Sequence, residues 1–352
     1  MEDSLGRFAP YGDAAGPHPD AALAAILARH GVPGAQIVHS RPGSTDAFAF
    51  GVRDAGTGDP VTPRTRFEAA SLTKVVAAYL VLRRVDAGRL DLDETLHSRH
   101  PSPRTDARAR RITARHVLAH TTGLPDWAGD PGSDEAPLTP AWEPGERFGY
   151  SGDGFQVLQR TVEAIDGRPF ARSLAEEVFG PFGMADTSLV FRLPDAAHLV
   201  AGHDRAGRPG IPSRYTRGSI AYTLTTTATD YDRFVRRALL GGEGLSPAAH
   251  AAWLAPASDA RGWPAAAAAD TVSWGLGVGL EHRADGDWAW HWGDNGIRTA
   301  FFAASPARGE AVGMFFNSSE GLRAVDAVLH RLLGAPRFAA LDWLGLPAAP
   351  RP

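Results

Sequence analysis

The chain of 352 residues contains no cysteine, which excludes a disulfide framework, a thiolate nucleophile and a cysteine-ligated metal site. Long apolar runs are missing too, because even the run from Val75 to Leu82 is well short of the roughly 18 residues that cross a bilayer. The first residues, Met1 to Asp3, lack the basic and apolar regions of a secretory signal. We therefore expect a cytoplasmic protein that does not bind membranes.

Neither sign of charge dominates: Lys and Arg total 36, Asp and Glu total 40, and the net charge is −4. No basic field is available to hold nucleic acid. Apolar residues make up 43% of the chain and charged residues 22%, the balance of a globular protein with a sizeable core. No glycine-rich phosphate or dinucleotide motif opens a helix after a strand, so we expect no cofactor. The composition leaves the oligomeric state open.

Lysine is almost absent, since Lys74 stands beside 35 arginines. Arginine keeps its proton in proteins, whereas a desolvated lysine can lose it and act as a base. Lys74 is therefore a candidate for proton chemistry. The alternative at this point is that an arginine-biased sequence retained one lysine by accident.

The order of predicted elements indicates an α+β fold. Strands near both chain ends would form an antiparallel sheet, flanked by helices, and a mostly helical domain would be inserted between them. The predicted strands are residues 35–39, 47–52, 273–280, 288–292, 299–304 and 311–316, and the predicted helices are residues 20–30, 72–87, 113–119, 154–165, 170–178, 226–240, 246–254 and 322–333. The predicted units are a loose segment (1–18), an α/β domain (19–75 and 226–335), a mostly helical domain (76–225) and a tail (336–352).

Ser71 and Lys74 form an S-x-x-K motif where a loop becomes a helix. Residues three apart on a helix lie on one face, so the hydroxyl and the amine are expected to be neighbours. A serine hydroxyl becomes a good nucleophile only when a nearby base takes its proton, and this motif supplies the base without a histidine. The competing interpretation is a serine N-cap followed by a surface lysine.

Further motifs occur in a fixed order around this pair. They are Val32–Ala35, Phe67–Ala70, Ile112–Pro125, Pro144–Phe155, Phe182–Thr187, Trp274–Gly277 and His291–Asn295. With them the sequence, over about residues 20–333, resembles the serine β-lactamase and penicillin-recognising superfamily. It is most similar to the esterase-like members around class C β-lactamases, of the family VIII carboxylesterase type. The resemblance implies the β-lactamase/transpeptidase-like fold.

The resemblance also implies roles for individual residues. Ser71 would be the acylated nucleophile, and Lys74 would accept its proton or lower the pKa of Tyr150. Tyr150 would relay the proton to the leaving group and later activate the incoming nucleophile; which of the two is the kinetic base stays open. His291 takes the first place of the family's Lys-Thr-Gly motif. The backbone N–H groups of Ser71 and Asp294 would form the oxyanion hole, and the expected substrate-binding residues are Gly152, Asp153, Trp292, Gly293 and Asn295.

Two positions depart from the β-lactamase pattern. Gly152 stands where the family's Tyr-x-Asn motif has an asparagine that holds a substrate amide, and His291 replaces a lysine that attracts a substrate carboxylate. Losing these polar partners should redirect selectivity, so we favour small or medium carboxylic esters over β-lactams and D-peptides. Asp153 or Asn295 could compensate for the missing asparagine.

Alternatives remain for the function and for single residues. The same acyl-enzyme could serve an acyltransferase, a peptide-releasing or cyclising enzyme, a D-aminoacyl peptidase or a β-lactamase; a non-catalytic binding protein is a third class. Taken alone, Tyr150 is a core aromatic and His291 a structural strand histidine. His116 and His120 are four apart on a predicted helix, but without an H-E-x-x-H pattern or a third ligand we expect structural roles and no metal.

Overall fold

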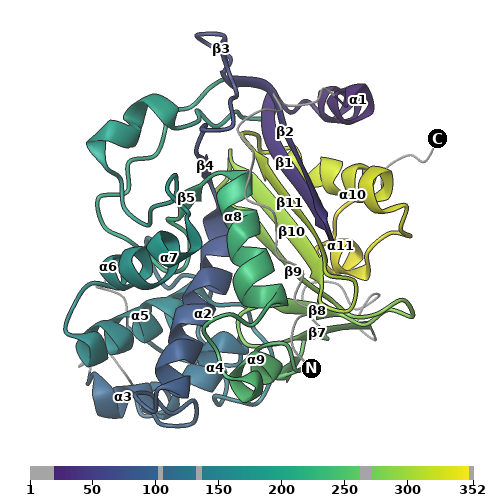
Figure 1. The fold of residues 1–352 in the computed structure, drawn as a ribbon. Coiled ribbons are helices and arrows are strands. Elements are labelled where there is room, and N and C mark those ends of the chain that lie inside the picture. Colours follow the sequence, from purple (N-terminus) through teal and green to yellow (C-terminus); the bar gives the residue numbers. More distant parts are fainter. Residues whose placement is uncertain (1–19, 102–105, 132–136, 262–270, 349–352) are drawn as a thin grey trace.

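In the computed structural model, which describes residues 20–101, 106–131, 137–261 and 271–348, the two chain ends meet in one antiparallel sheet (Figure 1). Ala35 of the first strand pairs with Phe316 of the last. Within the described residues the sheet has nine strands in the order β3-β2-β1-β11-β10-β9-β8-β7-β6. The strands are β1 (Gly34–Arg41), β2 (Ser44–Asp54), β3 (Asp59–Pro60), β6 (Ser258–Asp259), β7 (Val272–Trp274), β8 (Gly279–Glu281), β9 (Trp288–Asp294), β10 (Thr299–Ser305) and β11 (Glu310–Phe316).

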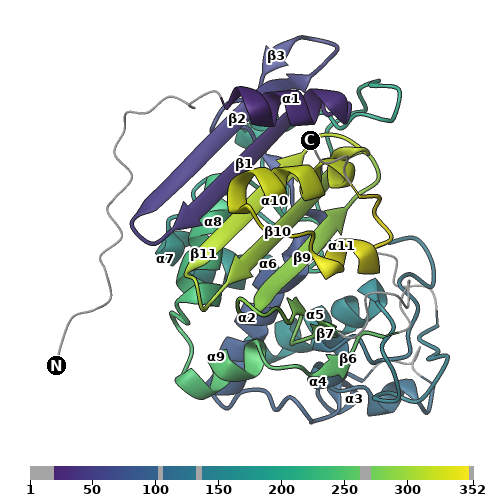
Figure 2. The ribbon, with the colours of Figure 1, turned by 90° about the vertical axis from the view of Figure 1, so that its right-hand side faces the viewer.

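Helices cover both faces of this sheet. Along β10, Phe301 and Ala303 enter one hydrophobic core while Ala300, Phe302 and Ala304 enter the other, because successive side chains of a strand point to opposite faces. The first core is closed by α1 (Ala21–Arg29), α10 (Val325–Leu333) and α11 (Ala339–Trp343), and the second by α2 (Thr73–Asp86) and α8 (Ala228–Phe234) (Figure 2). The predicted α+β architecture is thereby confirmed.

The remaining helices lie in the segment between the two groups of strands. They are α3 (Leu96–Arg99), α4 (Ala114–Leu118), α5 (Gly152–Asp166), α6 (Phe170–Leu174), α7 (Gly180–Phe182) and α9 (Pro247–Trp253), with π-helical turns at Ala175–Phe179 and Val235–Leu240. A short ladder, β4 (Phe67–Glu68) with β5 (Thr225–Thr226), joins the two ends of this segment. The domain division at residues 75/76 and 225/226 stays a prediction. Every helix of the described residues is too short or too polar to cross a bilayer.

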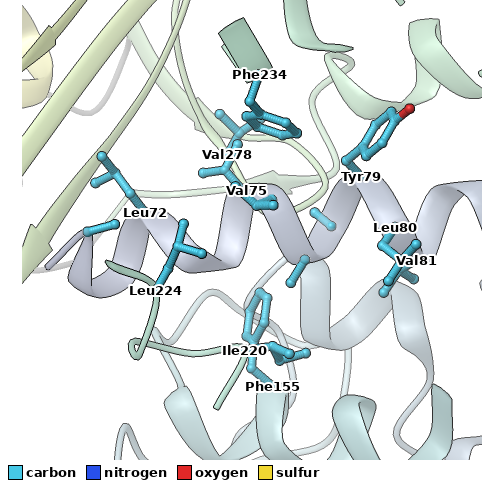
Figure 3. Close-up of a cluster of buried hydrophobic side chains, with 14 of the residues drawn as sticks. Leu72, Val75, Tyr79, Leu80, Val81, Phe155, Ile220, Leu224, Phe234 and Val278 are labelled. Atoms are coloured by element: carbon cyan, nitrogen blue, oxygen red, sulfur yellow. The ribbon is translucent and has the colours of Figure 1, made fainter. Parts of the chain in front are cut away.

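Helix α2 runs through the middle of the molecule, between the sheet and the helical segment. Figure 3 shows its side chains Val75, Tyr79 and Leu80 with Phe155 and Phe234 around them, which come from α5 and α8. A helix that is apolar on all sides must be buried on all sides, which explains the uninterrupted apolar run read from the sequence. Polar residues on such a helix therefore need partners within the protein.

Arg84, near the end of α2, has such partners. Its guanidinium donates to both carboxylate oxygens of Asp166 (2.6–3.0 Å) and both of Glu177 (2.6 and 2.8 Å). The side chains of Arg84 and Asp166 are only 6% and 2% exposed. The cluster ties α2 to the end of α5 and to the π-helical turn that follows α6.

Arg84→Ala is expected to lower the free energy of unfolding by about 3–5 kcal/mol, because it leaves buried carboxylates without their main counter-charge. Denaturant unfolding followed by circular dichroism measures this. Arg99→Ala is the matched control: it breaks an ion pair with Glu94 whose side chains are 44% and 32% exposed, so its effect should be far smaller. Equal losses in the two variants would contradict the structural role of Arg84.

Most predicted element ends agree with the structure, because local capping sets them. Asp20 caps α1 through hydrogen bonds from the amides of Ala22 and Leu23, and the 35–52 hairpin turns between Arg41 and Ser44. The single strand predicted over 273–280 is wrong, since β7 and β8 are separated by a reversal at Gly277. Gly277 has φ +82°, and a Cβ there would lie 2.7 Å from the Ala78 side chain of α2.

The end of the chain also differs from the prediction of a tail over residues 336–352. Residues 339–343 form α11, and Trp343 is fully buried, with its indole N–H donating to the Ala260 carbonyl at 3.0 Å. The helix predicted over 226–240 starts at Ala228, because residues 225–226 pair as β5 and Thr227 caps the helix. The loose segment 1–18 and the last residues, 349–352, lie outside the described residues.

Candidate active site

Ser71 lies in a single 3₁₀ turn, Ala70–Leu72, directly before α2. From Thr65 to Leu82 it is the one residue that is not buried, so its side chain is presented to solvent by an otherwise enclosed segment. The preceding residue, Ala70, has φ +47°. A left-handed conformation is strained for a residue with a Cβ and costs of order 1–3 kcal/mol, which the surrounding packing must offset.

Lys74 is fully buried one turn further along, and its Nζ lies 3.0 Å from Ser71 Oγ. The amine also donates to the Ala221 carbonyl at 2.9 Å and lies 4.9 Å from the ring centre of Tyr150. Burial lowers the pKa of Lys74 to about 7, and the negative charge of Asp126 opposes this shift. The predicted contact between hydroxyl and amine is present, and the lowered pKa makes the neutral amine available near neutral pH.

Tyr150 completes the group on the other side of the amine. It is 6% exposed, and its hydroxyl is buried with no partner at regular hydrogen-bond geometry. Burial raises the pKa of Tyr150 well above 10, while the nearby Ser71 hydroxyl opposes the rise. The structure therefore brings Ser71, Lys74 and Tyr150 together, with a neutral phenol beside a readily deprotonated amine.

His120 lies under Tyr150, a contact that the sequence analysis missed. The two rings stack with centroids 4.2 Å apart, and Nδ1 of His120 accepts a hydrogen bond from the amide of Ser151 at 3.1 Å. Among the described residues, His120 and Ala70 are the non-glycine residues with positive φ (+53° and +47°). Both strained positions thus adjoin the reactive group. The other histidine of this segment, His116, caps α4 by accepting from the Thr113 amide.

Strand β9 passes close to the serine turn at Gly293. A Cβ at this position would lie 2.4 Å from the Ala69 carbonyl oxygen, so only glycine permits the approach. This contact places the backbone of Asp294 beside the turn that carries Ser71. Trp292 is half-buried, and its ring centroid is 4.8 Å from that of Tyr150.

His291 lies on the same strand and is fully buried. Burial, together with the charge of Lys74, lowers the pKa of His291 to about 3, so the ring is neutral at pH 7. The Trp292 carbonyl lies 2.6 Å from its Nδ1, and because a carbonyl only accepts, Nδ1 carries the proton. The Nε2 lone pair is then left without a partner in the structure.

Three of the residues predicted to bind substrate form hydrogen bonds to other parts of the protein. The amide of Gly152 donates to Asp126 Oδ1 at 2.9 Å, and Asp153 Oδ2 accepts from the amide of Ala128 at 2.8 Å. The side-chain nitrogen of Asn295 donates to Glu68 Oε2 at 2.6 Å. Compensation for the missing asparagine by Asp153 or Asn295 remains a hypothesis, and these internal contacts disfavour it.

Glu68 is a second residue that sequence reasoning missed. It is 4% exposed, lies 3.0 Å from the buried Arg298 guanidinium, and accepts from the Tyr215 hydroxyl at 2.8 Å. This cluster fixes the turn after β9 to the loop that precedes Ala221. Its members are separated by more than 70 positions in the chain, so no local motif reveals it.

A cavity of about 990 Å³ opens between α5, α6 and the segment 187–222. It shares Tyr222 with the neighbourhood of the amine, but Ser71, Lys74 and Tyr150 do not line it. We assign no part of the chemistry to this cavity.

The chain is similar in sequence to known proteins over most of its length. Residues 19–335 match the family model described as Beta-lactamase. The chain is 27% identical to Penicillin-binding protein 4 of Amycolatopsis lactamdurans, over 93% of this chain and 92% of that protein. It is 33% identical to Esterase EstB of Burkholderia gladioli, over 53% of this chain and 51% of that protein.

The fold has close counterparts among solved structures. A class C β-lactamase superposes with a TM-score of 0.76 at 18% identity, covering 90% of this chain and 94% of that chain. At this identity the likeness speaks for the fold alone. The family match over most of the sequence shows that the protein is a member of the β-lactamase family of serine hydrolases, and its fold is the one found in that class C β-lactamase.

Proposed function

We propose that the protein forms an acyl-enzyme at Ser71 and hydrolyses carboxylic esters with small or medium acyl groups. The observation that carries this proposal is the 3.0 Å separation of Lys74 Nζ and Ser71 Oγ, with a lysine pKa of about 7. A neutral amine at hydrogen-bond distance can take the serine proton as the hydroxyl attacks an ester carbonyl.

In this mechanism the oxygen of the attacked carbonyl becomes an oxyanion, stabilised by the backbone N–H groups of Ser71 and Asp294. One such donor is typically worth about 2.7–4 kcal/mol. The proton on Lys74 then passes through Tyr150 to the departing alkoxide. Water, activated by the same pair, cleaves the acyl-enzyme and releases the carboxylic acid. Ser71 is thereby regenerated.

The recognition groups favour esters over β-lactams and D-peptides. His291 is neutral at pH 7, so it offers no positive charge to a substrate carboxylate. Gly152 has no side chain to hold a substrate amide. The similarity to Esterase EstB also supports this choice.

The direct test is incubation with p-nitrophenyl butyrate and, separately, with a serine-directed phosphonate. We expect hydrolysis and a covalent mass increase on Ser71, both abolished in Ser71→Ala. Adding an amine acceptor during turnover separates hydrolysis from acyl transfer, because a transferase would divert most of the acyl group to the amine. No turnover and no labelling of Ser71 would reject the proposal.

The pH dependence follows from the state of Lys74. Only the neutral amine accepts a proton, so kcat/KM for an uncharged ester is expected to rise through an apparent pKa near 7 and to level off above pH 8. Asp126→Asn should move the rise to lower pH, because the charge of Asp126 favours protonated Lys74. Rate measurements from pH 5 to 9 test this; a rise centred near pH 10 would contradict a desolvated base.

A further inference from the structure

The space beside Gly152 is filled by another residue. A Cβ built on Gly152 would lie 2.4–2.8 Å from three atoms of the Trp127 indole, Cζ2, Cη2 and Cε2. No side chain can therefore occupy position 152 while Trp127 holds its place. Trp127 thus fills the space that an asparagine side chain at position 152 would need.

Hydrogen bonds fix the backbone on both sides of Trp127 in the chain. The Ser151 hydroxyl donates to the Pro125 carbonyl at 2.7 Å, and the Ala128 amide donates to Asp153 Oδ2 at 2.8 Å. With the bond from Gly152 to Asp126, these contacts clamp the loop 125–128 onto the first turn of α5. The backbone that carries the indole is thus held in place before any substrate arrives, which reduces the entropy lost on binding.

The indole also contacts the segment that binds the catalytic amine. Its ring lies edge-on to Tyr222, with centroids 5.6 Å apart and an interplanar angle of 86°. The residue before Tyr222, Ala221, accepts the hydrogen bond from Lys74. Both residues are half-buried, so part of each remains accessible to solvent.

We propose that Trp127 and Tyr222 form an apolar wall beside Ser71 that selects esters of hydrophobic carboxylic acids, such as arylacetic acids, and rejects acylamino groups. This inference rests on the proposed esterase function and names its substrate class. An amide group next to the reacting carbonyl would lose its water against the ring carbons that face Gly152, which offer it no hydrogen bond. A buried polar group left unpaired lowers kcat/KM by about tenfold to a hundredfold.

The test compares three p-nitrophenyl esters that share one leaving group. Phenylacetate presents an apolar acyl group, N-acetylglycinate presents an amide in an acyl group of similar reach, and acetate reaches no wall. We expect the wild-type enzyme to prefer phenylacetate to N-acetylglycinate by at least about tenfold in kcat/KM. Trp127→Ala should remove most of this preference, measured as the ratio of the two kcat/KM values, and should change acetate turnover least of the three, because a small acyl group makes the fewest contacts with the wall.

Two further variants keep the test decisive. Trp142→Ala is the matched control: Trp142 covers Gly149, where a Cβ would lie 2.5 Å from its ring, but it has no contact with Tyr222 among those described. We expect this variant to retain the wild-type preference. In the Trp127→Ala background, Gly152→Asn has room for its side chain and should raise turnover of N-acetylglycinate about tenfold.

The outcomes separate this inference from the proposed function. If the wild-type enzyme hydrolyses none of the esters, the proposed function fails and the wall fails with it. If acetate is hydrolysed but the preference is absent, or survives in Trp127→Ala, the wall alone is overturned. If Trp127→Ala does not fold, Trp127→Leu replaces it, and equal loss for all three esters overturns the inference.

Discussion

Lys74→Arg is expected to reduce the rate of Ser71 acylation by about a hundredfold to ten-thousandfold, the usual contribution of a general base. The guanidinium keeps a positive charge near Ser71 but does not give up its proton at any accessible pH. Stopped-flow measurement of p-nitrophenol release, together with the rate of phosphonate labelling, reports acylation directly. A normal rate in this variant would reduce Lys74 to a structural cation.

The expected loss must be separated from a packing defect. Lys74 is 1% exposed and borders the rings of Tyr150 and Phe155, so the larger guanidinium will strain its slot, at a typical cost of about 1–3 kcal/mol. Lys74→Met is the companion variant, since it removes the base without adding volume or charge. Both variants should retain the wild-type circular dichroism spectrum and lose acylation. Recovery of activity in Lys74→Met would contradict the role of the amine.

The contact between Ser71 and Lys74 could be predicted because it is local in the sequence. Ser71 and Lys74 are three residues apart, and a helical turn brings such residues together whatever the rest of the fold does. Single-residue details were not predictable in the same way. Ser71 lies in a 3₁₀ turn rather than in α2 itself, and the strained φ of Ala70 has no sequence signature.

The surroundings of the site depend on contacts between distant segments of the chain. Such contacts cannot be predicted from a single sequence. Asp153 and Asn295 have the right residue types for substrate binding, yet the fold uses them to hold Ala128 and Glu68. Trp127 lies in a loop rich in glycine, proline and aspartate, where nothing marks it as a wall residue. Only the close approach to Gly152 assigns it that position.

The fold follows the same division between local and distant causes. Capping residues such as Asp20 and Thr113 mark helix starts, so most helices could be placed. The reversal at Gly277 exists because β7 and β8 must turn tightly against α2, and the burial of Trp343 requires a hollow formed by several other aromatic rings. Such packing overrides the local sequence pattern, which predicted a single strand over residues 273–280 and a tail from residue 336.

Tyr150→Phe should lower kcat by about a hundredfold to ten-thousandfold while leaving the fold intact, because it removes the hydroxyl that relays the proton and keeps the ring. The ring contacts with His120 and Trp292, at 4.2 and 4.8 Å, stay available to phenylalanine. The Tyr150 hydroxyl is buried without a regular hydrogen-bond partner, so its removal should leave the melting temperature equal or higher.

The leaving group makes this prediction specific to proton relay. p-Nitrophenolate can depart without a proton, whereas an alkoxide must be protonated as it leaves. Acylation by ethyl butyrate should therefore be slowed more than acylation by p-nitrophenyl butyrate. Tyr79→Phe is the matched control on α2: its hydroxyl donates to the Glu243 carbonyl at 2.8 Å, away from Ser71. That variant should lose about 1 kcal/mol of stability and keep ester turnover. Equal acylation defects with the two butyrates would contradict a relay to the leaving group and leave Tyr150 as a packing residue.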